Sequence, residues 1–177
     1  MVPISAGLQG VVVVLALAAV AAPTAAQAQG VVNRPQLSAA LANELVGDTV
    51  AICTSRGYKV WAVVVNLDGV RIALLRGDGA PIHSQDNAYY KAYTASSLTL
   101  GRNENSTKEI SDRMAKAAPT TVPSTPLPNV TYAQGAIVIR GPGGQIIGSI
   151  GVSGAPGGGL DEACAREALA KIQDRIK

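Results

Sequence analysis

Two pairs of β-rich segments, each joined by a tight turn, constrain the fold of this chain more than any other feature. The first pair, residues 59–66 (KVWAVVVN) and 70–76 (VRIALLR), flanks the turn signal Asp68-Gly69. The second pair, within residues 136–153, flanks a Gly-Pro turn. Turns this short connect antiparallel neighbours. The sequence therefore predicts an α+β protein with an antiparallel sheet and packed helices, not a βαβ chain.

Four segments carry helical signals. Residues 36–57 have an apolar stripe that ends at Gly57, and residues 160–177 repeat such a stripe at the end of the chain. A helix from Ser84 to about Leu98 is expected, with Ser84 as its cap and Asp86 in its first turn. Residues 103–117 predict a polar helix. The four prolines in residues 118–129 predict a loop.

The first 28 residues read as a secretory signal peptide. An unbroken run of apolar and small residues covers 11–22, and Ala26-Gln27-Ala28 is an A-x-A cleavage pattern. The run is shorter than the roughly 20 residues of a membrane span, although an uncleaved anchor is the alternative. We therefore divide the chain into a signal peptide (1–28), an N-terminal arm (29–36) and one domain (37–177), and we expect no stable membrane span after cleavage.

Composition and motifs exclude several classes of function. The net charge of +3 comes from scattered Lys and Arg without an aromatic platform, so nucleic acid is not the expected partner. Residues 148–159 are rich in glycine but lack a phosphate-binding signature, and Asp161 and Glu162 would repel an anion there. Gly151–Ala155 only nearly matches a nucleophile elbow. One histidine and two distant cysteines do not make a structural zinc site.

Three stretches together resemble the GlcG/HbpS-like heme-binding family. They are VNLDGVRIALLRGDGA (65–80), KAYTAS (91–96) and IIGSIGVSGA followed by DEACA (146–165). The resemblance covers about residues 37–177. Asn66 stands where the family commonly has Asp, which puts any role of that acid in doubt.

The resemblance implies a profilin-like fold with a five-stranded antiparallel sheet of order 2-1-5-4-3 and helices on both faces. It also implies a homo-oligomer. In exported members it implies heme binding or heme-linked sensing. We therefore expect a periplasmic or secreted heme-binding or heme-responsive protein, with heme held non-covalently because no CxxCH motif is present.

The candidate ligand-binding residues are Arg76, His83, Tyr90, Lys91 and Thr94. Heme needs an axial ligand, cations for its propionates and an apolar slot. His83 is the possible axial ligand, and Arg76 and Lys91 are the possible cations. The resemblance strengthens the expectation for Lys91 because it begins KAYTAS.

Other interpretations of the same residues remain open. Tyr89 and Tyr93, four residues apart, are as consistent with helix packing as with a place beside the heme ring. His83 is equally consistent with a plain loop position. In the alternative function, an enzyme or binding protein takes a small carboxylate with Arg76, His83 and Lys91, and His83 is its acid or base.

The sheet order implied by the resemblance places the start of the first strand beside the end of the last. Cys53 precedes the first strand, and Cys164 follows the last. A Cys53–Cys164 disulfide is therefore expected, with two buried free thiols as the alternative.

Overall fold

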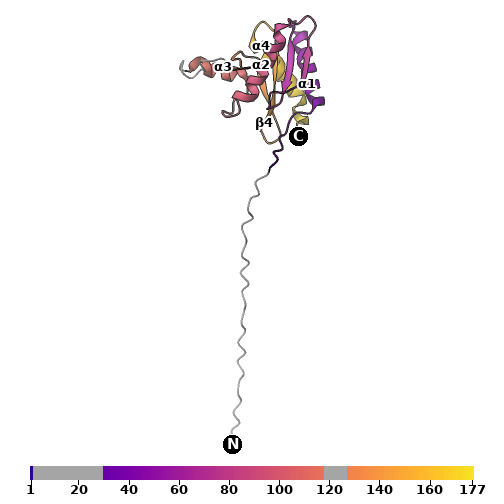
Figure 1. Ribbon diagram of the computed structural model, residues 1–177. Helices are drawn as coiled ribbons and strands as arrows, with labels where there is room; N and C mark the ends of the chain where they lie inside the picture. The colour runs from indigo at the N-terminus through magenta and orange to yellow at the C-terminus, as the bar shows by residue number, and fades with distance from the viewer. Residues whose placement is uncertain (2–29, 118–126) are drawn as a thin grey trace. The chain divides into compact units, whose positions relative to one another are not determined.

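The computed structural model describes Met1 and residues 30–117 and 127–177 (Figure 1). The predicted signal peptide and most of the predicted proline-rich loop lie outside these residues. Asn33–Lys177 form one compact unit. Within the described ranges, no helix is both long and apolar enough to cross a membrane. The elements in chain order are α1 (Ala39–Ser55), β1 (Trp61–Val65), β2 (Arg71–Arg76), α2 (His83–Leu98), α3 (Thr107–Lys116), β3 (Ala136–Arg140), β4 (Ile146–Ser153), α4 (Gly158–Ile172) and the 3-10 helix η2 (Gln173–Arg175).

The sheet is antiparallel throughout, as predicted, but it has four strands among the described residues. Their order is β2-β1-β4-β3. The expectation of five strands in the order 2-1-5-4-3 is therefore wrong in strand number. The order of the other four agrees with it.

Beside β3, the described residues add only one isolated bridge to the sheet. Ser106 pairs with Ile137, and the amide of Val138 donates to the carbonyl of Asn105 at 2.9 Å. Directly after this bridge, Ser106 caps α3 by accepting a hydrogen bond from the amide of Glu109 at 3.3 Å. The chain turns into a helix here and leaves no further residue to extend the pairing.

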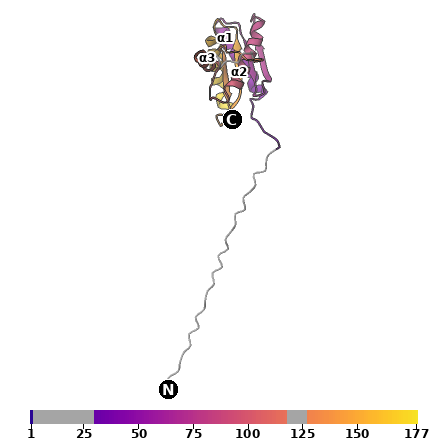
Figure 2. The same cartoon turned by 60° about the vertical axis from the view of Figure 1, so that its left-hand side comes forward.

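Helices cover both faces of the sheet (Figures 1 and 2). Alternate residues of β1 point to opposite faces. Ala62 and Val64 join a core cluster with α1 and α4, whereas Val63 and Val65 pack against α2. The two faces of one strand thus serve two separate cores.

Helix α2 lies directly against β4 because a glycine faces it. A Cβ on Gly151 would overlap the carbonyl of Ala88 and approach the amide of Ala92 to 2.6 Å. Ala88 and Ala92 are both fully buried. Small residues on both elements therefore set how closely α2, which carries most of the predicted site, approaches the sheet.

The local predictions hold at the turns and fail at one cap. The amides of Asp68 and Val70 both donate to the Asn66 side chain at 3.0 Å, and Gly69 takes a φ of 75°, so the first hairpin turns where predicted. Ser84 does not cap α2. The helix begins at His83 with Ile82 at the N-cap position, and Ser84 is buried in the first turn.

A disulfide joins Cys53 of α1 to Cys164 of α4, as predicted, with the two Cα atoms 5.6 Å apart. Both residues are fully buried. The bond ties together the two helices that share one face of the sheet, and it spans 111 positions of the sequence.

Candidate functional site

Four of the five predicted ligand residues lie on α2, and the fifth, Arg76, ends the edge strand β2. His83, Tyr90 and Thr94 are separated by seven and then four residues, which places them on one flank of the helix. Lys91 lies between this flank and the sheet. The structure therefore groups the predicted residues of α2, and the loop at 77–82 connects Arg76 to the start of that helix.

Lys91 is buried in an ion pair. Its ammonium donates to Asp161 at 2.8 Å and to the carbonyl of Val152 at 3.0 Å, and its residue surface is 5 % exposed. Asp161 also accepts a hydrogen bond from the amide of Ala155 at 3.0 Å. This arrangement connects α2, the end of β4 and the first turn of α4.

Burial raises the pKa of Asp161 above its ordinary value, although the charge and hydrogen bond of Lys91 pull that pKa down. Desolvation therefore has the larger effect on this carboxyl group. Gly135 allows the loop before β3 to pass over the pair, because a Cβ there would lie 2.7 Å from the Lys91 ammonium. The Lys91–Asp161 pair is thus enclosed by the fold.

Thr94 is also buried, and its hydroxyl holds a loop. It accepts a hydrogen bond from the amide of Thr131 at 2.9 Å. Lys91 and Thr94, which the sequence predicts as ligand residues, therefore lie inside the fold and hold surrounding segments in place.

Arg76 and His83 lie at the surface, at the two ends of the β2–α2 loop. The guanidinium of Arg76 donates to the carbonyl of Ala80 at 2.7 and 3.0 Å and lies 5.5 Å from the ring centre of Trp61. Trp61 in turn donates its indole N–H to the carbonyl of Pro81 at 3.0 Å. These bonds fix the loop that leads to His83.

Exposed aliphatic side chains accompany these two polar residues. Ile82, next to His83, is 71 % exposed, and Leu74 is 37 % exposed. Leu74 and Arg76 pair with Val63 and Trp61, so they share the α2 face of the sheet. At Leu74 and Arg76, helix α2 therefore does not fully cover the edge strand β2.

The tyrosines of α2 form a contiguous group. The ring of Tyr89 lies 5.9 Å from that of Tyr90 and 6.0 Å from that of Tyr93. Arg71 of β2 stacks on Tyr89 at 3.6 Å, and the Tyr89 hydroxyl donates to the carbonyl of Gly69 at 3.1 Å. Tyr89 therefore fastens α2 to the first hairpin, which favours the packing interpretation of this residue.

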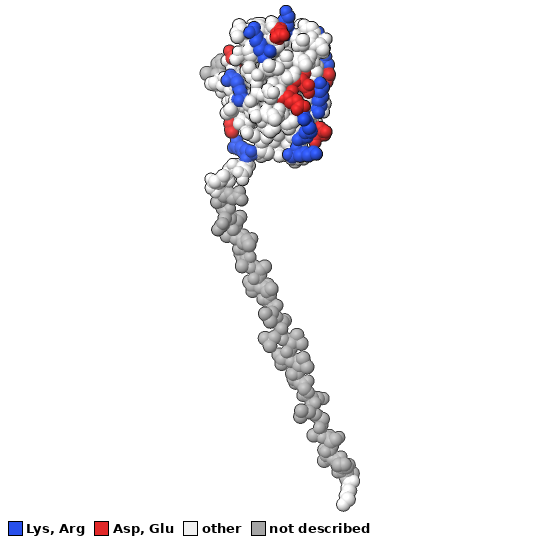
Figure 3. Space-filling view, turned by 90° about the vertical axis from the view of Figure 1, so that its right-hand side faces the viewer, with Lys and Arg blue, Asp and Glu red and all other residues white. Residues whose placement is uncertain are grey.

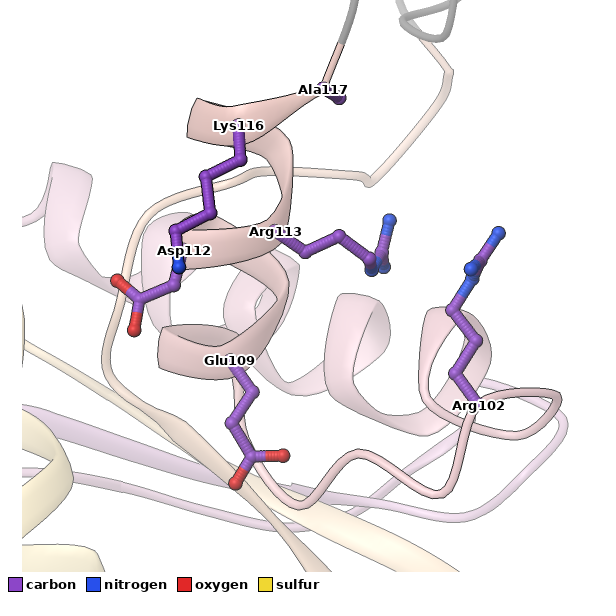
Figure 4. Close-up of a pocket in the computed structure, with 6 residues that line it drawn as sticks. All are labelled: Arg102, Glu109, Asp112, Arg113, Lys116 and Ala117. Carbon is purple, nitrogen blue, oxygen red and sulfur yellow. The ribbon is translucent and has the colours of Figure 1, made fainter.

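Two surface pockets lie away from the predicted ligand residues. One of about 670 Å³ borders α3, where the guanidinium groups of Arg102 and Arg113 extend to the same side (Figure 4). Its acids already have partners: Glu109 accepts from the amide of Asn105, and Asp112 pairs with Lys108. The other hollow, about 500 Å³, lies between β3 and α4. Neither is lined by a predicted ligand residue.

The sequence does not reveal the partner of Lys91 or the position of Trp61. It marks Asp161 only as an acid near a helix start, and 70 positions separate this residue from Lys91. It marks Trp61 only as part of a strand. Spacing along the chain carries no signal for either contact, because both depend on how distant elements pack.

The surface residues fit the chemistry of an open heme site. His83 offers an exposed imidazole, Arg76 offers a cation, and Ile82 and Leu74 offer exposed apolar surface. Lys91 adds no free cation to this set, because its ammonium already serves Asp161 and Val152.

Comparisons with known proteins agree on one family. A family model described as "Haem degrading protein HbpS-like" matches residues 37–170. A crystal structure of a double mutant of HbpS from Streptomyces reticuli is 32 % identical, covers 86 % of this chain and 98 % of its own, and superposes with a TM-score of 0.70. The crystal structure of a PduOC:heme complex is 25 % identical over 77 % of this chain and 94 % of its own, with a TM-score of 0.66.

A third structure, the protein ORFY of Klebsiella pneumoniae, is 23 % identical and shares the fold. It covers 82 % of this chain and 97 % of its own, with a TM-score of 0.69. No curated protein matches the chain.

Proposed function

Because the chain belongs to the HbpS-like family, we propose that it is an exported protein that binds heme non-covalently at the start of α2. The family match and the heme complex of a related structure support a heme-related function. The observation on this chain that carries the proposal is the exposed imidazole of His83, next to the exposed Ile82 and at the end of the loop that Arg76 begins.

In this proposal each residue has one task. The imidazole of His83 would bind the iron, and Arg76 would supply a cation for a propionate. Ile82 and Leu74 would supply apolar surface, and Tyr90 lies on the same helix flank as His83. Bound heme would supply redox-active iron. The Lys91–Asp161 pair and Thr94 act as positioning groups, since both hold segments around α2.

The alternative function requires a change in the fold. A small-carboxylate site built from Arg76, His83 and Lys91 needs the ammonium of Lys91 to leave Asp161 and reach the surface. Heme binding through His83 and Arg76 needs no such movement. The structure therefore supports heme better than this alternative.

A hemin titration tests the proposal. We expect the purified protein to give a Soret band with saturable binding, and His83→Ala to lose it or weaken binding by about tenfold or more. Lys108→Ala, at an exposed position on α3, is the control and should bind like the natural chain. Saturable binding that His83→Ala leaves unchanged would place the site elsewhere.

A further inference from the structure

The pocket between the edge strand β3 and helix α4 has a volume of about 500 Å³. Helix α4 lines it with one stripe of side chains that includes Arg166, Leu169 and Ala170, three and four positions apart, and β3 lines it with Ile137 and Arg140. Pockets of this size, with apolar walls and a few polar groups, are typical of sites for small molecules. The polar groups therefore indicate what kind of molecule this pocket suits.

The two arginines lie toward different ends of the pocket. A Cβ on Gly158, the first residue of α4, would lie 2.3 Å from the carbonyl oxygen of Gln134, just before β3 begins. Helix α4 and strand β3 therefore start side by side. Arg140 is the last residue of β3, so it lies farther along the pocket than Arg166, with apolar side chains of α4 between them.

The charge of Arg166 is already compensated, because its guanidinium donates two hydrogen bonds to Glu162, at 2.6 and 3.0 Å. Arg140 differs. It donates only to neutral oxygens, those of the Asn103 and Asn105 side chains and the carbonyl of Gly144, at 2.7–3.2 Å. The described part of the chain offers this half-buried guanidinium no acidic partner, and no acidic residue lines the pocket.

Elsewhere on the molecule, acids and bases are matched. On the face shown in Figure 3, acidic side chains mostly lie beside basic ones. Helices α1 and α4 are joined by the ion pairs Arg56–Glu167 and Arg175–Glu44. The positive charge at the Arg140 end of the pocket has no such match and is complementary to an anion.

Arg140 is also held ready for such an anion. Its four hydrogen bonds fix the plane of the guanidinium and leave one of the five N–H groups, on Nη1, without a partner among the described residues. A cation fixed in advance loses little freedom when it binds a ligand, and its hydrogen bonds to a carboxylate are charge-assisted. The lining next to it is apolar on the α4 side, at Leu169 and Ala170.

We propose that this pocket is a binding site for a small organic acid with an apolar body. The carboxylate binds at Arg140, and the apolar body lies along Leu169 and Ala170. None of the residues assigned to heme lines this pocket. The inference therefore does not depend on heme binding.

Isothermal titration calorimetry with octanoate tests the site. We expect the natural chain to bind octanoate saturably, with a dissociation constant of about 1 mM or lower. Octan-1-ol has the same chain length without the charge, so it should give no detectable binding at the concentration that half-saturates octanoate. The absence of saturable octanoate binding, or octan-1-ol binding as tightly as octanoate, would overturn the proposal.

Variants locate the site. Ala170→Glu places a negative charge at an exposed helix position in the pocket, and Arg140→Gln removes the cation; each should weaken octanoate binding about tenfold or more. Arg140→Lys, which keeps the charge, should bind more tightly than Arg140→Gln. Ala51→Glu, at an exposed position on α1, is the matched control and should bind like the natural chain.

Two results separate this site from others. His83→Ala should leave octanoate binding unchanged, because that residue does not line the pocket. Ala170→Glu tests the pocket without removing the hydrogen bonds of Arg140, so its result stands even where Arg140→Gln loosens the fold. Octanoate binding that Ala170→Glu leaves intact, or that His83→Ala abolishes, would place the acid outside this pocket.

Discussion

At the scale of single residues, the buried Lys91–Asp161 pair is the most consequential contact of the predicted site. Removing one partner of a buried pair typically costs about 3–5 kcal/mol, because a charge is left without compensation. We expect Lys91→Met to lower the free energy of unfolding by this order. Lys91→Met/Asp161→Asn should lose less, because no unpaired carboxylate is buried. Urea denaturation measures both. Lys108→Met, which breaks an exposed helix pair, is the control and should change little.

The same pair predicts a pH dependence. The pKa of folded Asp161 is raised, so the folded state holds more protons than the unfolded state between the ordinary carboxyl pKa and the raised one. Stability contributed by this group therefore falls as pH rises through that window. Without Lys91 the pKa of Asp161 should rise further. The deficit of Lys91→Met should accordingly be smaller in mild acid than at neutral pH, and an equal deficit at both would contradict the assignment.

At the scale of elements, the Cys53–Cys164 disulfide joins α1 to α4 across a closed loop of more than one hundred residues. Disulfides typically stabilise a fold by about 2–4 kcal/mol, in part by restricting the unfolded chain. We expect the Cys53→Ala/Cys164→Ala variant to melt at a lower temperature than the natural chain. Intact mass without reductant should be about 2 Da below that of the reduced chain, since two hydrogens are lost when the bond forms. Two alkylatable thiols after unfolding would show that the bond is absent.

Element-scale features also show what the sequence could predict. Asp68-Gly69 and the Gly-Pro turn identified both hairpins, because turn chemistry acts over a few residues. The fifth strand was implied by the resemblance and not by a local sequence pattern, and the described residues have only an isolated bridge at Ser106 beside β3. Ser84 failed as a cap because the N-cap position is taken by Ile82, two residues earlier, and no short sequence pattern separates these cases. The sequence identified the candidate residues, but not which of them are buried, because Lys91 is buried against Asp161 of α4 and Thr94 against the loop at Thr131.

At the scale of the whole molecule, the chain is expected to lose residues 1–28. The A-x-A pattern ends at Ala28, so the mature protein should begin near Gln29. A disulfide is consistent with an oxidising compartment such as the periplasm or the exterior. Mass spectrometry of protein isolated from its native host checks this prediction. A mature protein that still begins at Met1 would contradict it.

The position of Trp61 makes its fluorescence sensitive to changes near the start of α2. It is the single tryptophan of the chain, is only 7 % exposed, and lies below Arg76 with its indole N–H bound to the loop that leads to His83. All tryptophan fluorescence of the chain therefore comes from a side chain beside the start of α2. A chromophore bound at the start of α2 would quench the fluorescence of Trp61 by energy transfer. A rearrangement of the loop would shift the wavelength of its emission maximum. The chain thus carries a built-in reporter of its own loop.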